Sequence, residues 1–149
     1  MEKKITDDNL ISLSAYIKAN WNLPDTDIRS YSGLTLAYIG DAIYDLVIRT
    51  YIVENGNAPV NKLHKQVVKL VQATAQAKLY HIIKDMLTEE EQAIFKRGRN
   101  AKSFTSAKNA DIVEYRTATG VEALVGYLYL TGRTGRMLEL IYPVLSEQT

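Results

Sequence analysis

The chain has 149 residues, of which 46% are hydrophobic and 23% charged, and its formal net charge is +1. Its length suits one domain with a substantial core, and this average composition excludes collagen-like, low-complexity and wholly disordered chains. Because it contains no cysteine, a disulfide framework, a thiol nucleophile and a cysteine-ligated metal site are also excluded.

The amino-terminal segment alternates charges and has no apolar leader, and no later run approaches the ~20 apolar residues of a membrane helix. We therefore expect a cytoplasmic protein with no membrane partner. The charges are unevenly distributed, because residues 60–109 hold ten Lys and Arg against four Asp and Glu. Such a basic segment is either an ordinary solvated face or a surface that binds a polyanion.

Hydrophobic residues recur at helical spacing through most of the chain, which predicts an all-α fold without strands. A capping box of Thr88 and Glu91 marks the start of one helix. No linker divides the chain, so we expect one compact unit in which residues 1–33 form an N-terminal helical extension. The predicted helices cover approximately residues 6–19, 34–54, 61–86, 89–98, 111–130 and 136–145.

Two of these helices are apolar nearly all round, yet each carries an acid. Asp41 lies within the apolar run Leu34–Ile48, and Glu122 is the only acid of the run Val121–Leu130. Apolar helices of this kind are expected to be buried, and burying an isolated carboxylate is costly unless a cation or several donors compensate it. Gly40 and Gly126 would let the two helices approach closely and so bring the acids together.

Two compensations remain open from the residues alone. Arg49 or Arg116 could form an ion pair with Asp41, as in a purely structural helical adaptor. Alternatively, a divalent cation could lie between Asp41 and Glu122, and oxygen ligands without Cys suit Mg²⁺. Mg²⁺ held in this way would orient and activate water for phosphodiester hydrolysis.

Basic and polar residues on both sides of the fourth predicted helix provide donors for phosphate oxygens. Residues 99–108 form a polar, basic loop free of acids, and a second patch lies on the third helix. His64 is equally well explained as a solvated or capping residue. The candidate substrate-binding residues are His64, Lys65, Arg97, Arg99, Asn100, Lys102 and Lys108.

The segment LAYIGDAIYDLVIR resembles the signature helix of the ribonuclease III catalytic domain, and GVEALVGYLYL resembles its second acidic motif. The segments LHKQVVKLVQATAQAK and KRGRNAKSFTSAKNAD resemble Mini-ribonuclease III, the compact branch without a double-stranded-RNA-binding domain. The resemblance covers most of residues 34–131, and it implies that residues 34–149 are a ribonuclease III-type catalytic domain.

This resemblance implies a helical bundle that forms a homodimer through its signature helices, with a valley for duplex RNA. The implied activity is Mg²⁺-dependent endonucleolytic cleavage of double-stranded RNA that leaves 5′-phosphate and 3′-hydroxyl ends. Asp41 and Glu122 match catalytic, metal-binding acids of the family. The substrate associated with this branch is precursor 23S ribosomal RNA, with a large-subunit ribosomal protein as helper.

The chain departs from the full-length family pattern at three acidic positions, which here are Leu34, Ala37 and Thr119. Either the ion keeps more water ligands, or Asp45 or Asp111 completes its shell, and Thr119 could donate to a bound water. The missing acids also leave open a catalytically inactive module that binds structured RNA through the same fold.

Overall fold

The computed structural model describes residues 12–101 and 111–146. These residues form helices connected by short turns, and no strand occurs among them, which confirms the all-α prediction. The elements are α1 (Leu13–Asn20), η1 (Ile28–Ser30), α2 (Gly33–Glu54), α3 (Val60–Val71), α4 (Ala73–Ile83), η2 (Lys84–Met86), α5 (Glu89–Arg99), α6 (Asp111–Leu130), α7 (Thr134–Ile141) and α8 (Pro143–Ser146).

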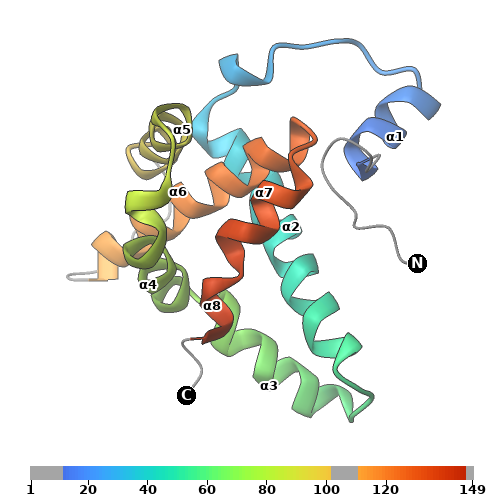
Figure 1. The fold of residues 1–149 in the computed structure, drawn as a ribbon, viewed down its shortest axis with the longest axis vertical. Coiled ribbons are helices and arrows are strands. Elements are labelled where there is room, and N and C mark those ends of the chain that lie inside the picture. The colour runs from blue at the N-terminus through green and yellow to red at the C-terminus, as the bar shows by residue number, and fades with distance from the viewer. Residues whose placement is uncertain (1–11, 102–110, 147–149) are drawn as a thin grey trace, which may run out of the picture.

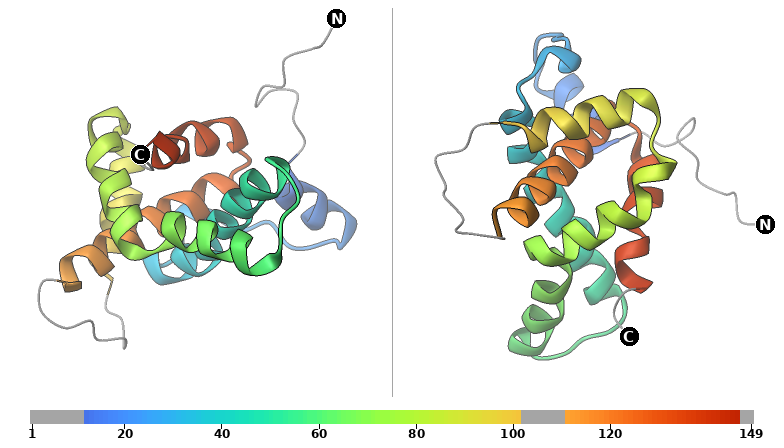
Figure 2. Two further views of the ribbon diagram at one scale, coloured as in Figure 1. Left: turned by 90° about the horizontal axis from the view of Figure 1, so that it is seen from below. Right: turned by 90° about the vertical axis from the view of Figure 1, so that its left-hand side faces the viewer.

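Helix α6 passes through the middle of the bundle and packs most extensively against α2, then against α5 and α4 (Figures 1 and 2). Its middle residues are buried almost without interruption from Thr117 to Leu128. The core around it includes the fully buried side chains of Leu36, Phe95 and Leu128. None of the described helices is long and apolar enough to span a membrane.

The third predicted helix is in fact two helices, α3 and α4, so a single long helix was a wrong prediction. Gln72 lies between them in an extended conformation (φ −67°, ψ 158°). Tertiary hydrogen bonds occupy carbonyls near the break, because the Tyr44 hydroxyl donates to Leu70 O (3.1 Å) and Gln76 Nε2 donates to Val71 O (2.9 Å). The break therefore leaves these polar groups satisfied.

Two other helix boundaries differ from the prediction. Helix α1 begins at Leu13, later than expected, because the Ser12 hydroxyl accepts a hydrogen bond from Ala15 N (3.2 Å) and caps it. The last predicted helix is interrupted at Tyr142, and Pro143 opens the short α8. Proline is compatible with a first helical turn, where its missing N–H has no intrahelical partner to lose.

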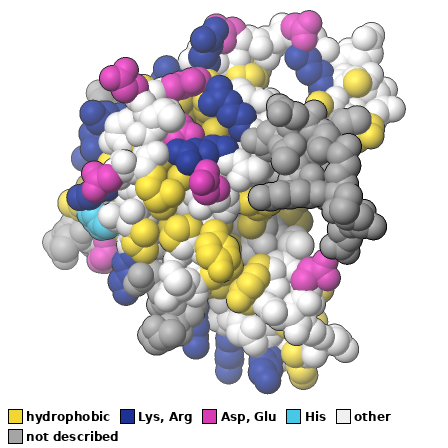
Figure 3. Space-filling view, viewed as in Figure 1, with side chains coloured by type: hydrophobic (Ala, Val, Ile, Leu, Met, Phe, Trp, Pro, Cys, Tyr) yellow, Lys and Arg dark blue, Asp and Glu magenta, His cyan; other side chains and the backbone are white. Residues whose placement is uncertain are grey.

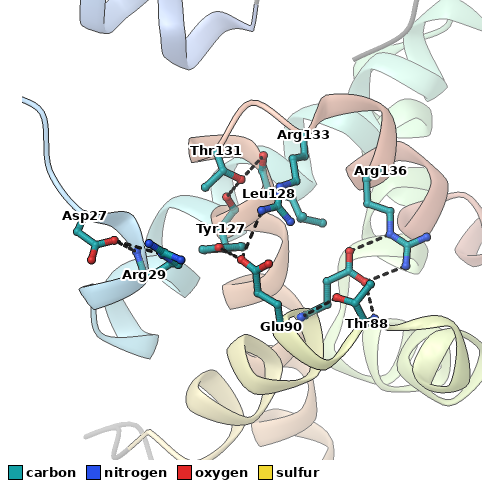
Figure 4. Close-up of polar contacts among 10 residues, drawn as sticks. Asp27, Arg29, Thr88, Glu90, Tyr127, Leu128, Thr131, Arg133 and Arg136 are labelled. Atoms are coloured by element: carbon teal, nitrogen blue, oxygen red, sulfur yellow. Dashed lines mark hydrogen bonds and ion pairs between the residues drawn. The ribbon is translucent and has the colours of Figure 1, made fainter. Parts of the chain in front are cut away.

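Polar contacts join α5 to the two helices beside it (Figure 4). The capping box of Thr88 and Glu91 is present as predicted. The buried Glu91 carboxylate also accepts two hydrogen bonds from Arg136 of α7, each 2.8 Å long. Tyr127 of α6 donates its hydroxyl hydrogen to Glu90. These contacts fix the position of α5, whose last residues are candidates for binding substrate.

The segment before α2 is attached to the body of the bundle. Ile28 and Tyr31 pack against the hydrophobic core. Arg97 Nη1 donates to the backbone carbonyls of Arg29 and Tyr31, the second at 3.0 Å. The turn η1 therefore belongs to the packed structure, although it precedes the signature helix.

Candidate active site

Glycine allows α2 and α6 to meet backbone to backbone. A Cβ atom on Gly40 would overlap the carbonyl oxygen of Glu122, and one on Gly126 would overlap the carbonyl oxygen of Leu36. The close approach expected from the two glycines is thus confirmed. Because Asp41 follows Gly40, this contact places the two candidate acids beside each other.

The carboxyl groups of Asp41 and Glu122 lie within hydrogen-bonding reach of one another. Burial raises the pKa of the Glu122 carboxyl to about 8, and the hydrogen bond and charge of Asp41 contribute to the same shift. Burial, followed by the charge of Glu122, also raises the pKa of the Tyr44 hydroxyl above its ordinary range. The exposed Asp41 and the half-buried Glu122 thus lie together where α2 meets α6 and form one acidic site.

Within residues 12–101 and 111–146, no Lys or Arg side chain forms an ion pair with Asp41 or Glu122. Arg49 pairs with Asp45 instead, with its Nε 2.7 Å from Oδ2. The alternative in which Arg49 neutralises Asp41 is therefore wrong, and Asp45 is engaged one helical turn away.

Gln76 of α4 is a third polar side chain at this acidic site, and it is not among the residues predicted from the sequence. Its side chain is buried, with the residue only 2% exposed, and its amide lowers the pKa of Glu122 through a hydrogen bond. Its Oε1 atom is buried and finds no hydrogen-bond partner in the part of the chain that the structure describes. The available signal was its spacing, since Gln76 precedes Leu79 and Ile83 on the apolar stripe of α4.

The donor set fits a hard divalent cation. Asp41 and Glu122 supply carboxylate oxygens without a neutralising base among the described residues. The described residues contain no cluster of three or more His, Cys, Asp or Glu suited to a metal. Mg²⁺ commonly uses one or two protein carboxylates and retains several waters, so Asp41 and Glu122 could hold it.

The remaining candidates for this pocket take other roles in the structure. The Thr119 hydroxyl donates to the Tyr115 carbonyl at 3.0 Å within α6, and a role for it toward a bound water stays a prediction. Asp111 lies eleven residues before Glu122 on the same continuous helix, about 16 Å along its axis. Within one chain, Asp111 is therefore too far along α6 to share a ligand site with Glu122.

The expectation that α2 is buried all round is also wrong for the single chain. Tyr38 is 83% exposed, Leu46 50% and Leu34 39%, and Asp41 is exposed as well. The opposite side of the helix is covered, with Leu36 and Ile43 in the core. Helix α2 therefore presents an uncovered apolar strip beside the acidic pocket.

The basic candidates on α5 lie near the beginning of α2. Arg97 contacts the segment before α2 through the carbonyls described above. Arg99 Nε donates to Asn100 Oδ1 at 3.1 Å, and its guanidinium lies 5.8 Å from the centre of the Phe95 ring. Lys102 and Lys108 lie outside the described residues.

The basic candidates on α3 lie near the other end of α2. His64 and Lys65 are exposed, and His64 lines a pocket with Arg49 and Ile52. In the view of Figure 3, Lys and Arg side chains lie along the lower edge of the molecule, where α3 lies in Figure 1. Since α2 has 22 residues and is about 33 Å long, the two basic groups flank the acidic pocket along it.

The raised pKa of Glu122 predicts a pH effect on stability in metal-free protein. Between the unfolded value of about 4.3 and the folded value of about 8, the native state holds a proton that the unfolded state has released. The free energy of unfolding should therefore fall as pH rises, by up to about 1.4 kcal/mol per pH unit. Urea unfolding in EDTA at pH 5.5, 6.5 and 7.5 measures this slope, and Glu122→Gln should reduce it. Equal slopes in both proteins would contradict the prediction.

Comparisons with known proteins agree on one family. Residues 34–133 match the Ribonuclease III domain. A Mini-ribonuclease 3 of Enterococcus faecalis is 52% identical over 117 residues, covering 77% of this chain and 89% of that protein. Another, from a Thermoanaerobacter species, is 48% identical over 139 residues, covering 91% and 98%. The crystal structure of a Fusobacterium nucleatum protein superposes with a TM-score of 0.73 at 37% identity, covering 84% of this chain and all of that one.

Proposed function

Since the chain belongs to the ribonuclease III family, and within it to the Mini-ribonuclease 3 branch, we propose that it cleaves double-stranded RNA with Mg²⁺ held by Asp41 and Glu122. Family membership identifies the chain as an endoribonuclease. The observation that carries the proposed metal site is the convergence of the two acids, which lie within hydrogen-bonding reach of each other and have no basic partner among the described side chains.

The reaction is hydrolysis of a phosphodiester, in which water forms a new P–O bond while the bond to the 3′ oxygen breaks. When bound, Mg²⁺ helps to deprotonate water and neutralises charge that develops on the phosphate. Asp41 and Glu122 are the residues that hold the ion, and the contact between Gly40 and Gly126 fixes the distance between their helices. The leaving 3′ oxygen takes a proton, which yields 5′-phosphate and 3′-hydroxyl ends.

The RNA backbone is bound by the basic residues on either side of the acidic pocket. Arg99 and Asn100 near the beginning of α2, and His64 and Lys65 near its end, present donors that suit phosphate and sugar oxygens. Arg97 contributes through guanidinium nitrogens other than Nη1, while Lys102 and Lys108 remain sequence-based proposals. Recognition through the backbone follows A-form shape, and binding should weaken steeply with salt.

The natural substrate that we propose is precursor 23S ribosomal RNA, as the resemblance to Mini-ribonuclease III implies. A large-subunit ribosomal protein would present the duplex in a cleavable form. Because ribosomal RNA of this kind is processed in the cytoplasm, the enzyme would act there.

The uncovered strip of α2 supports a homodimer. Tyr38, Leu34 and Leu46 expose apolar surface on the helix through which family members are expected to pair. Burying such a strip against a second copy removes apolar surface from water, which is the main favourable contribution to association. Two copies would also place two acidic pockets on one duplex-binding surface.

Tyr38→Glu is expected to make the protein monomeric, because a charge in the centre of an apolar interface must be desolvated without a partner. Sedimentation velocity on wild type and variant measures the change in mass. Tyr142→Glu is the matched control, since Tyr142 is also exposed, at 68%, but lies after α7. A dimer that survives Tyr38→Glu would place the interface elsewhere.

Incubation with a duplex RNA and a duplex DNA of the same sequence, in Mg²⁺ and in EDTA, tests the proposed function. We expect cleavage of the RNA alone, in Mg²⁺ alone, with 5′-phosphate ends. Adding precursor 23S ribosomal RNA, with and without large-subunit ribosomal proteins, tests the proposed substrate. Intact duplex RNA in both Mg²⁺ and Mn²⁺, together with retained binding, would instead favour the inactive RNA-binding module.

A further inference from the structure

Gln76 is a polar residue at a position that packing alone would fill with an apolar one. It lies on the buried stripe of α4 together with Leu79 and Ile83, and only 2% of its surface is exposed. Buried polar groups are normally satisfied by hydrogen bonds, so an exception requires a reason. Here the exception is Oε1, which has no hydrogen-bond partner within residues 12–101 and 111–146.

The orientation of the Gln76 carboxamide is fixed from one side. Nε2 donates to Val71 O at 2.9 Å, across the break between α3 and α4. The same amide lies within hydrogen-bonding reach of the Glu122 carboxylate. The side chain thus links the end of α3 to Glu122, and its Oε1 atom has no hydrogen-bond partner among the described residues.

We propose that Gln76 is a positioning residue of the metal site. Its amide group, held by Val71, orients the Glu122 carboxylate, and its unpartnered Oε1 accepts a hydrogen bond from a buried water. Substituting a residue that hydrogen-bonds to a metal ligand and orients it typically lowers metal affinity by roughly 10- to 100-fold. This inference depends on the proposed function, because it needs a cation at Asp41 and Glu122.

Binding of Mn²⁺ in the absence of RNA, measured by electron paramagnetic resonance, tests the proposal without relying on cleavage. Gln76→Leu should raise the dissociation constant by about 10-fold or more and shift the Mg²⁺ dependence of cleavage, with the KM for RNA unchanged. Gln92→Leu is the matched control. Gln92 also has a buried Oε1 without a partner, but its Nε2 donates to Tyr80, and Gln92 lies on α5. Gln92→Leu should therefore leave the affinity for Mn²⁺ unchanged.

A second measurement uses the unaltered protein, so it does not depend on a variant that folds. In ¹⁵N-labelled wild type, adding Mg²⁺ should shift the side-chain amide signals of Gln76 and leave those of Gln92 in place. Equal Mn²⁺ affinity in wild type and Gln76→Leu, or unmoved Gln76 signals in protein that binds Mg²⁺, would overturn the role of Gln76 alone. Wild type that binds neither ion and leaves duplex RNA intact would overturn the proposed function as well.

Discussion

Asp41→Asn and Glu122→Gln should each lower the rate of duplex RNA cleavage in Mg²⁺ by more than about 100-fold, because outer-shell metal partners alone are worth roughly 10- to 100-fold. Each substitution replaces a carboxylate of the acidic pocket by a neutral amide of nearly the same shape. Single-turnover cleavage measures the loss, and filter binding in EDTA should show that affinity for RNA is retained.

Asp45→Asn is the matched control for these variants. It makes the same chemical change on the same helix, but Asp45 pairs with Arg49 at 2.7 Å. We expect cleavage within a few-fold of wild type, since an exposed ion pair of this kind contributes little to stability. Near-normal cleavage by Asp41→Asn, or an equal loss in Asp45→Asn, would remove the assignment of Asp41.

Gly40→Ala should destabilise the fold by about 3 kcal/mol or more, at the upper end of the usual overpacking cost. The added methyl group would overlap the carbonyl oxygen of Glu122, which is backbone and cannot rotate away. Helices α2 and α6 would have to separate, and the acidic pair would separate with them. Thermal unfolding should show a melting temperature roughly 10 °C lower, and activity should fall even below that temperature.

Ala42→Ser provides the comparison, since it also adds one heavy atom to α2, but at an exposed position. Gly126→Ala should reproduce the loss from the other helix, because its added atom would meet the Leu36 carbonyl. Unchanged melting of Gly40→Ala would mean that the two helices pack less closely than described.

Local signals predicted most of the helices. The capping box of Thr88 and Glu91 identified the start of α5, and the apolar runs around Asp41 and Glu122 identified α2 and α6. These features depend on residues within a few positions of each other, so they can be identified from the sequence alone. The contact between α2 and α6 was also predictable, because glycine is the residue that permits close approach of two helices.

The break at Gln72 could not be predicted from neighbouring residues. No Gly or Pro marks it, and helical periodicity continues across it. It is stabilised by Tyr44 of α2 and by Gln76, whose side chains bind the carbonyls of Leu70 and Val71. Such contacts exist only after the helices are packed. For the same reason, the position of Gln76 beside Glu122 could not be predicted from the sequence.

The exposure of Tyr38 shows a second limit of predicting burial from the sequence. An apolar helical sequence predicts that the helix surface is buried. It does not indicate whether that surface is covered by the same chain or by another molecule. In the single chain, Tyr38 remains 83% exposed. The apolar pattern of α2 therefore does not by itself predict which of its residues one copy of the chain covers.

The attachment of η1 sets a lower limit on how short a working version of this enzyme can be. Ile28 and Tyr31 pack against the core, and Arg97 binds carbonyls of the same segment. A truncated protein that starts at residue 34 would still contain the matched Ribonuclease III domain, but it would expose apolar surface and release the Arg97 side chain. Trimming at about residue 27 retains these contacts, so the minimal folding unit extends upstream of the catalytic signature.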